Sequence, residues 1–150
     1  MLHIFVDADA CPVKEEIYRV ARRYGLRVTL VANSAMRVPP DVEFELVIVR
    51  EGLDEADDWI AAATNVDDIV ITGDIPLASR CLLRGSRVLG THGKAFTEDN
   101  VGEALATREL LAELRGAGAV TGGPAPFQKS DSSRFLQSLD SIVQAIKRNA

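Results

Sequence analysis

Six aspartates fall where the sequence pattern places the ends of two strands and the start of a helix. They are Asp7, Asp9, Asp54, Asp57, Asp58 and Asp74. Carboxylates that gather in one place repel one another unless a cation offsets their charge. Mg²⁺ and Mn²⁺ accept carboxylate and water oxygens more readily than zinc does. The residue types therefore predict a site for Mg²⁺ or Mn²⁺.

The spacing of these aspartates suggests that they converge. Asp7 and Asp9 are two positions apart, which puts both side chains on one side of an extended segment. Positions 54, 57 and 58 are three and four apart and share one face of a helix. Ligands of open α/β sheets bind beyond the carboxyl ends of the strands. We therefore expect all six as metal ligands. The expected catalytic residues among them are Asp7, Asp9, Asp58 and Asp74.

Each aspartate also has a simpler interpretation as a structural residue. An aspartate between a strand and a helix often caps the helix, which would account for Asp54 and Asp74. Asp9 could serve only to form a turn. Asp57 and Asp58 could be a solvated first helical turn that the helix dipole favours. The coincidence of all these positions is what favours a site over separate caps.

Three polar residues near the same edge are candidates for substrate binding. Lys14 lies one turn into the predicted first helix, where it could contact a phosphate or simply be solvated. Asn33 and Ser34 end the second predicted strand and could line the cleft or form only a polar turn. His92 has no partner in the sequence and is interpreted as a turn residue.

Short apolar runs alternate with amphipathic segments along the chain. Strands are predicted at residues 2–6, 26–32, 44–49, 68–72 and 87–89. Helices are predicted at 12–24, 54–64, 75–84, 97–115 and 131–148. This order predicts an α/β fold of three layers, with helices on both faces of a mostly parallel five-stranded sheet. Residues 1–150 are predicted to form a single domain, with the 117–130 loop and the last helix packed on it.

Composition narrows the classes of function. The chain has 150 residues, 47% of them hydrophobic, 5% aromatic, and a net charge of −5. Nucleic-acid binders are usually basic overall, so such binding would need a local basic patch or metal ions. Cys11 and Cys81 have no CxxC partner and are expected to be buried thiols in a reducing compartment. The short apolar start and the lack of a run of about 18 apolar residues predict a cytoplasmic protein without membrane contact.

Several segments together resemble one family of bacterial proteins. They are Val6–Lys14, Ala56–Ile60, Thr72–Ala78, the Gly-Gly-Pro-Ala-Pro-Phe stretch at 122–127, and Arg134-Phe135. The combination is similar to the YaiI/YqxD family and runs through nearly the whole chain. The resemblance implies a PIN-like, Rossmann-like fold, but it brings no established activity.

PIN-like proteins are typically metal-dependent ribonucleases with acidic residues at strand ends. The resemblance therefore implies Asp7 as the first-strand acid and Asp74 as the fourth-strand acid. The helical acid would be Asp54, Asp57 or Asp58. Asp9 would match the second acid of the Asp-x-Asp motif.

Three functions remain open at the level of sequence. The first is a phosphodiesterase that uses Mg²⁺ or Mn²⁺ to cleave RNA or another nucleic acid. The second is a phosphatase in which Asp7 is the nucleophile and Asp9 the acid and base, although the expected further residues are incomplete. The third is a non-catalytic module that binds a metal or nucleotide. The sequence does not define the oligomeric state.

Overall fold

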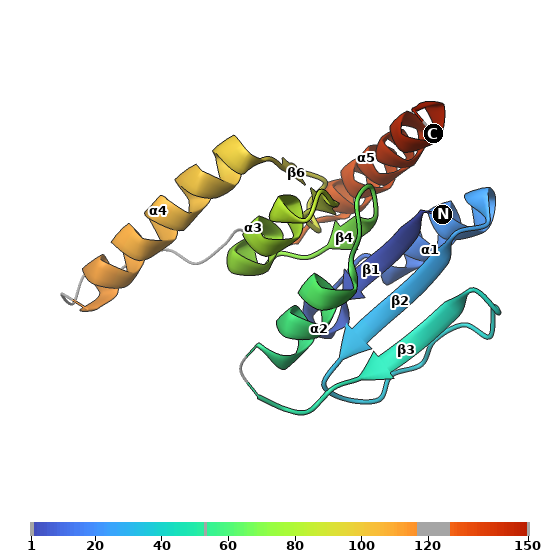
Figure 1. Ribbon diagram of the computed structural model, residues 1–150, viewed down its shortest axis with the longest axis horizontal. Helices are drawn as coiled ribbons and strands as arrows, with labels where there is room; N and C mark the ends of the chain where they lie inside the picture. The colour runs from blue at the N-terminus through green and yellow to red at the C-terminus, as the bar shows by residue number, and fades with distance from the viewer. Residues whose placement is uncertain (1, 53, 117–126, 150) are drawn as a thin grey trace.

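The computed structural model describes residues 2–52, 54–116 and 127–149. Within them, six strands form one sheet in the order β3-β2-β1-β4-β5-β6 (Figure 1). The strands are β1 (His3–Asp7), β2 (Arg27–Ala32), β3 (Phe44–Ile48), β4 (Ile69–Ile71), β5 (Arg87–Leu89) and β6 (Ala95–Phe96). The helices are α1 (Lys14–Tyr24), α2 (Glu55–Ala63), α3 (Ile75–Leu83), α4 (Glu98–Gly116) and α5 (Lys129–Arg148), with a 3₁₀ turn, η1 (Ala8–Ala10), after β1.

The sheet has one strand more than the five that the sequence predicts. Strands β1 to β5 pair in parallel, as predicted, and β6 pairs antiparallel with β5. A tight turn joins β5 to β6, in which the N–H of Gly90 donates to the carbonyl of Lys94 at 2.9 Å. A strand of two residues is too short to produce a periodic pattern in the sequence, which is why it was missed.

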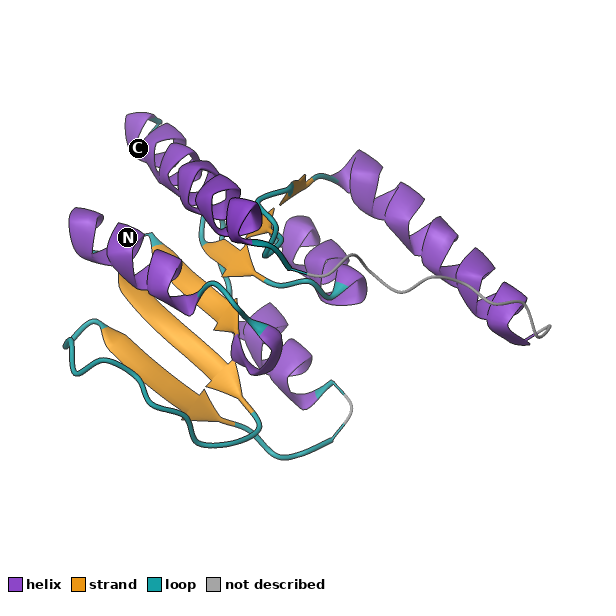
Figure 2. Cartoon of the chain, turned by 180° about the vertical axis from the view of Figure 1, so that it is seen from behind, coloured by secondary structure: helices purple, strands orange, loops and turns teal. Residues whose placement is uncertain are grey.

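Helices cover both faces of the sheet, so the predicted three-layer α/β architecture is confirmed (Figure 2). Alternate residues of β1 point to opposite faces, because strand side chains have a period of two. Ile4 and Val6 join a buried cluster that includes Ile17 of α1 and Phe135 of α5. Phe5 joins the cluster on the other face, which is built from α2, α3 and the start of α4.

The strand order creates a switch point between β1 and β4. The chain leaves β1 through α1 and returns in β2 on one side, whereas β4 pairs with the other side of β1. Crevices at such points, beyond the carboxyl ends of the strands, are where α/β sheets bind ligands. Asp7 ends β1, and Thr72 directly follows β4.

The last helix begins earlier than the sequence predicts. Helix α5 starts at Lys129, where Gln128 and Asp131 form a reciprocal capping box. Most of the predicted 117–130 loop, residues 117–126, lies outside the described residues. None of the helices in the described part of the chain is long and apolar enough to cross a membrane.

Candidate active site at the β1–β4 switch point

A buried hydroxyl connects the ends of β1 and β4. The Oγ1–H of Thr72 donates to Oδ2 of Asp7 at 3.0 Å. The Oγ1 atom of Thr72 also accepts a hydrogen bond from the N–H of Asp74 at 3.0 Å. Thr72 is 1% exposed, so neither hydrogen bond is weakened by competition with bulk water. The two hydrogen bonds tie the carboxylate of Asp7, at the end of β1, to the backbone of Asp74, just beyond β4.

The two carboxylate oxygens of Asp74 have different roles. Its Oδ1 accepts from the N–H of Leu77 at 2.9 Å, which fixes the first turn of α3. The capping interpretation is therefore correct for this oxygen. Across the described residues, Oδ2 of Asp74 accepts no hydrogen bond from the protein, which leaves it able to bind a ligand.

Asp57, on the first turn of α2, belongs to the same electrostatic field. Burial, and after it the negative charges of Asp74, Asp7 and Asp54 in that order of importance, raise the pKa of Asp57 to about 6, against a lowering effect of Arg80. Burial also raises the pKa of Asp7, against the lowering effect of the hydrogen bond from Thr72. Asp7, Asp57 and Asp74 are called here the switch-point carboxylates, because the charge of Asp74 disfavours ionisation of both Asp7 and Asp57.

Asp58 points elsewhere. Its Oδ1 accepts from an N–H of Arg80 on α3 at 2.7 Å, and both side chains are largely exposed. The structure therefore brings Asp57, rather than the expected Asp58, to the ends of β1 and β4. Asp54 sits at the N-cap position of α2 with a left-handed backbone, and its side chain makes no capping hydrogen bond.

Asp9 and the three expected substrate-binding residues flank this group on the β2 side. Oδ2 of Asp9 accepts from the N–H of Asn33 at 2.9 Å, which ties the 3₁₀ turn after β1 to the end of β2 rather than closing a local turn. Oδ1 of Asn33 is buried without a hydrogen-bond partner among the described residues. The Nζ of Lys14 donates to the carbonyl of Cys11 at 3.1 Å, and Ser34 is exposed.

The donor set suits a hard divalent cation held in an open manner. Among the described residues, no three carboxylate, thiol or imidazole side chains stand close enough together to form a closed metal cage. Mg²⁺ seldom uses such a cage, because it keeps several waters and takes one or two protein carboxylates. Asp7 and Asp74, each with an oxygen that accepts no protein hydrogen bond in the described part of the chain, fit that requirement.

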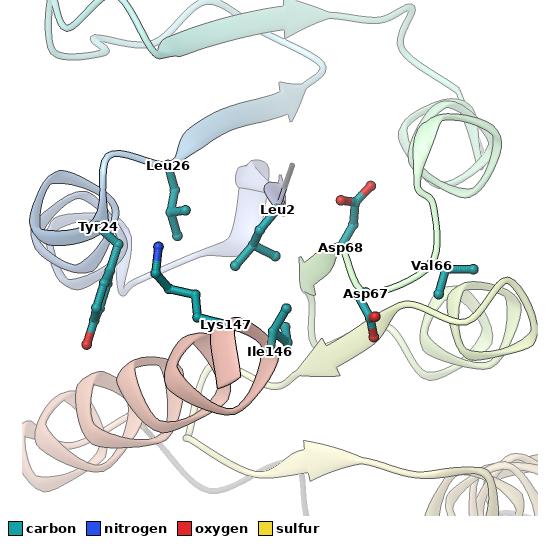
Figure 3. Close-up of a pocket in the computed structure, with 8 residues that line it drawn as sticks. All are labelled: Leu2, Tyr24, Leu26, Val66, Asp67, Asp68, Ile146 and Lys147. Carbon is teal, nitrogen blue, oxygen red and sulfur yellow. The ribbon is translucent and has the colours of Figure 1, made fainter. Parts of the chain in front are cut away.

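A cavity opens at the opposite, amino-terminal edge of the sheet (Figure 3). It has a volume of about 420 Å³, and its lining includes Leu2, Leu26, Asp68 and Lys147. Asp68 has a structural role there, because its two oxygens accept from the N–H groups of His3 and Asn65. The volume of this cavity therefore does not identify it as the functional site. The switch-point carboxylates lie at the opposite edge of the sheet.

Sequence reasoning missed the connecting role of Thr72, and it could not anticipate that Asp58 pairs with Arg80 while Asp57 responds to the charges of Asp74 and Asp7. Thr72 was visible only as a strand-end residue, because its partner Asp7 is 65 positions away. The phase of α2 decides between Asp57 and Asp58. That phase depends on how the helix packs, through the buried Ile60, against the sheet.

The whole chain is similar to one group of bacterial proteins. The family model described as "Uncharacterized BCR, YaiI/YqxD family" matches residues 5–145. A UPF0178 protein of Rhodospirillum centenum is 53% identical over 99% of this chain and 99% of its own length. A UPF0178 protein of Sphingopyxis alaskensis is 55% identical over 97% of this chain and 95% of its own. No solved structure matches the chain significantly. The match over nearly the full length, with the motifs around Asp7 and Asp74 inside it, shows that this chain belongs to the YaiI/YqxD family.

Proposed function

We propose that this chain is a phosphodiesterase that depends on Mg²⁺ or Mn²⁺ and acts on nucleic acid, with RNA as the expected substrate. The observation that carries the proposal is the Thr72 hydroxyl, which links Asp7 to the backbone of Asp74 at the switch point of the sheet. Ligands of this class of fold bind at that point. Asp57 supplies the third carboxylate.

Uncompensated negative charge at this place supports a cation as the natural ligand. In the described part of the chain, none of the switch-point carboxylates forms an ion pair with a lysine or arginine. The charge of Asp74 raises the pKa of Asp7 and of Asp57, and the charge of Asp7 also raises that of Asp57, which is a cost to the folded protein that a bound cation would remove. A phosphate substrate would reach the same carboxylates only with that charge offset.

The residues would divide the chemistry among them. Asp7 and Asp74 would hold the metal, which when bound supplies positive charge for the leaving oxygen and lowers the pKa of a water. Asp57, which binds no lysine or arginine in the described part of the chain, would accept the proton of the attacking water. Thr72 would keep the carboxylate of Asp7 in one orientation through the whole cycle.

The phosphatase alternative has less support from the positions of its expected residues. Asp9, its acid and base, is engaged by the N–H of Asn33. Lys14 donates to the Cys11 carbonyl instead of reaching toward Asp7. Detection of a phosphorylated Asp7 after incubation with a phosphate monoester would reverse this ranking.

A cleavage assay tests the proposal. A labelled pool of single-stranded RNA, and a DNA pool of the same sequences, would be incubated with the protein and Mn²⁺, Mg²⁺ or a chelator. We expect metal-dependent cleavage that Asp7→Asn and Asp74→Asn each reduce at least about 100-fold, the scale for losing a group that stabilises transition-state charge.

Asp58→Asn is the matched control, because it changes the same chemical group one position from Asp57 and affects only an exposed ion pair. It should keep the wild-type rate. Cleavage that is equal in wild type and Asp7→Asn would contradict the proposal. Metal binding by the wild type without turnover of either pool would identify a binding module instead.

A further inference from the structure

Helix α4 leaves the body of the molecule after its first turns (Figures 1 and 2). Val101 is buried against the α2–α3 layer, but the later leucines Leu110 and Leu114 are 56% and 40% exposed. At 100° per residue these leucines lie on a different side of the helix from Val101, so one packing partner cannot cover both. The second half of α4 therefore shows an apolar surface that residues 2–52, 54–116 and 127–149 leave uncovered.

The uncovered side of α4 is also acidic. Its exposed residues on one helical face are Glu103, Ala106, Glu109, Leu110, Glu113 and Leu114, called here the acidic face. Arg108 lies on the opposite side by helical phase. A partner for the acidic face must therefore offer apolar surface together with positive charge.

The chain itself carries a surface with those properties. A shallow groove of about 360 Å³ between α2 and α3 is lined by Ala61, Ala62, Arg80, Leu83 and Arg84. Leu83 is 80% exposed, so its side chain is almost uncovered. Arg80 forms an ion pair with Asp58. Arg84 has no carboxylate partner among the described residues, and its Nε donates a hydrogen bond to the carbonyl of Thr64.

We propose that the acidic face of α4 from a second copy of this chain docks in the α2–α3 groove, and that the two copies do so reciprocally. The spacing supports this pairing. Glu109 and Glu113 are one helical turn apart, as are Arg80 and Arg84, so two carboxylates can face two guanidinium groups in register. Leu110 and Leu114 then lie over the exposed Leu83.

Two-fold symmetry makes the arrangement self-consistent. In an isologous dimer each copy supplies one α4 and one groove, so the contact occurs twice and buries twice the area. Doubling matters because a single helix-in-groove contact falls short of the roughly 1,000 Å² that a stable interface needs. The proposal accounts for both exposed apolar surfaces with one partner and is independent of the function of the switch-point carboxylates.

Sedimentation of the full chain over a range of concentrations tests the dimer. We expect the wild type to be a dimer that Glu113→Arg and Arg84→Glu each weaken by about tenfold or more in Kd, because each places like charges opposite one another. The double variant with both changes should restore dimerisation to near the wild-type Kd, because the charge pair is re-formed with opposite polarity.

Arg108→Glu, on the opposite side of α4, is the matched control and should leave the Kd unchanged. Circular dichroism would establish that each variant is folded. A wild type that stays monomeric up to the highest concentration, or a dimer that neither single variant weakens, would overturn the proposal. Failure of the double variant to recover would overturn the assignment of the groove.

Discussion

The hydroxyl of Thr72 makes two hydrogen bonds, one as donor and one as acceptor. It donates to the carboxylate of Asp7 and accepts from the backbone of Asp74 in a site that is 1% exposed. Removal of the hydroxyl would leave the partly buried carboxylate of Asp7 and the N–H of Asp74 without these partners. The orientation and the ionisation of Asp7 should therefore both depend on this residue.

The first prediction concerns Thr72→Val. Because the hydrogen bond from Thr72 lowers the pKa of Asp7, its loss should raise that pKa further. The variant should also lose about 1 kcal/mol in the free energy of unfolding, the usual net contribution of a hydrogen bond. Carboxyl chemical shifts followed by NMR against pH would report the pKa. Thr72→Ser keeps the hydroxyl and should titrate like the wild type, and equal titration of the valine variant would contradict the assigned hydrogen bond.

The second prediction concerns the pH dependence of stability through Asp57. Its pKa in the folded protein is raised from 3.8 to about 6, so ionisation is disfavoured in the folded state. Without metal, its stabilising contribution is complete below pH 3.8 and is lost as the pH rises through about 6. Asp57→Asn removes this loss. Above pH 6 its free energy of unfolding should exceed that of the wild type by about 1 kcal/mol after solvent screening.

Asp58→Asn provides the comparison for that measurement. It removes an exposed ion pair with Arg80, which is worth only a few tenths of a kcal/mol. Urea unfolding at several pH values would separate the two variants. A parallel pH dependence for wild type and Asp57→Asn would show that Asp57 does not lie in the field of the other carboxylates.

Individual residue types were predictable from sequence at this site, but their roles were not. Asp7 and Asp74 follow apolar runs that are recognisable as strands, and their positions at strand ends follow directly. The difference between Asp57 and Asp58 is one position in a helix, or about 100° of rotation. Only packing of α2 against the sheet decides which of the two faces the strand ends.

At the scale of elements, the turn between β5 and β6 is held closely against α5. The hydroxyl of Ser138 on α5 donates to the carbonyl of Gly93 at 2.8 Å. A Cβ built on Gly93 would come within 2.9 Å of the backbone of Arg134 and Phe135, and the residue has a φ of +91°. Both the space and the backbone conformation therefore require glycine here.

The third prediction follows from this close approach. Gly93→Ala should destabilise the protein by about 2–3 kcal/mol, because either the turn or α5 must move and the backbone is strained. Gly102→Ala in α4 is the matched control, since a Cβ there meets no atom within 4 Å. It should be neutral or stabilising by up to about 1 kcal/mol, as expected for alanine in a helix. Thermal unfolding of both variants would check the difference, and equal melting temperatures would contradict the packing described.

Most elements were predictable because their signals are local. Thr97 and Asn100 cap the start of α4 reciprocally, with hydrogen bonds of 2.8 and 3.1 Å. Strand β6 was not predictable, since two residues carry no period. The exposed half of α4 was predicted as helix, but the exposure of Leu110 and Leu114 among the described residues could not be predicted from the sequence.

At the scale of the whole molecule, the strand order is what makes a site from separate residues. Alternation of strands and helices predicts the layers, but it does not say which strands are neighbours. Because β4 pairs with β1, Thr72 reaches Asp7 across 65 positions of sequence. The same strand order places the switch-point carboxylates together at the ends of β1 and β4. Their negative charge contributes to the net charge of −5 of the chain.

The most direct test of the account is calorimetric titration of the protein with Mg²⁺ and Mn²⁺. We predict that the wild type binds a divalent cation, that Asp7→Asn weakens the binding at least about tenfold, and that Asp58→Asn leaves it unchanged. The reason is that Asp7 belongs to the switch-point carboxylates, whereas Asp58 pairs with Arg80. No binding by the wild type, or equal binding by Asp7→Asn, would contradict a metal site at the ends of β1 and β4.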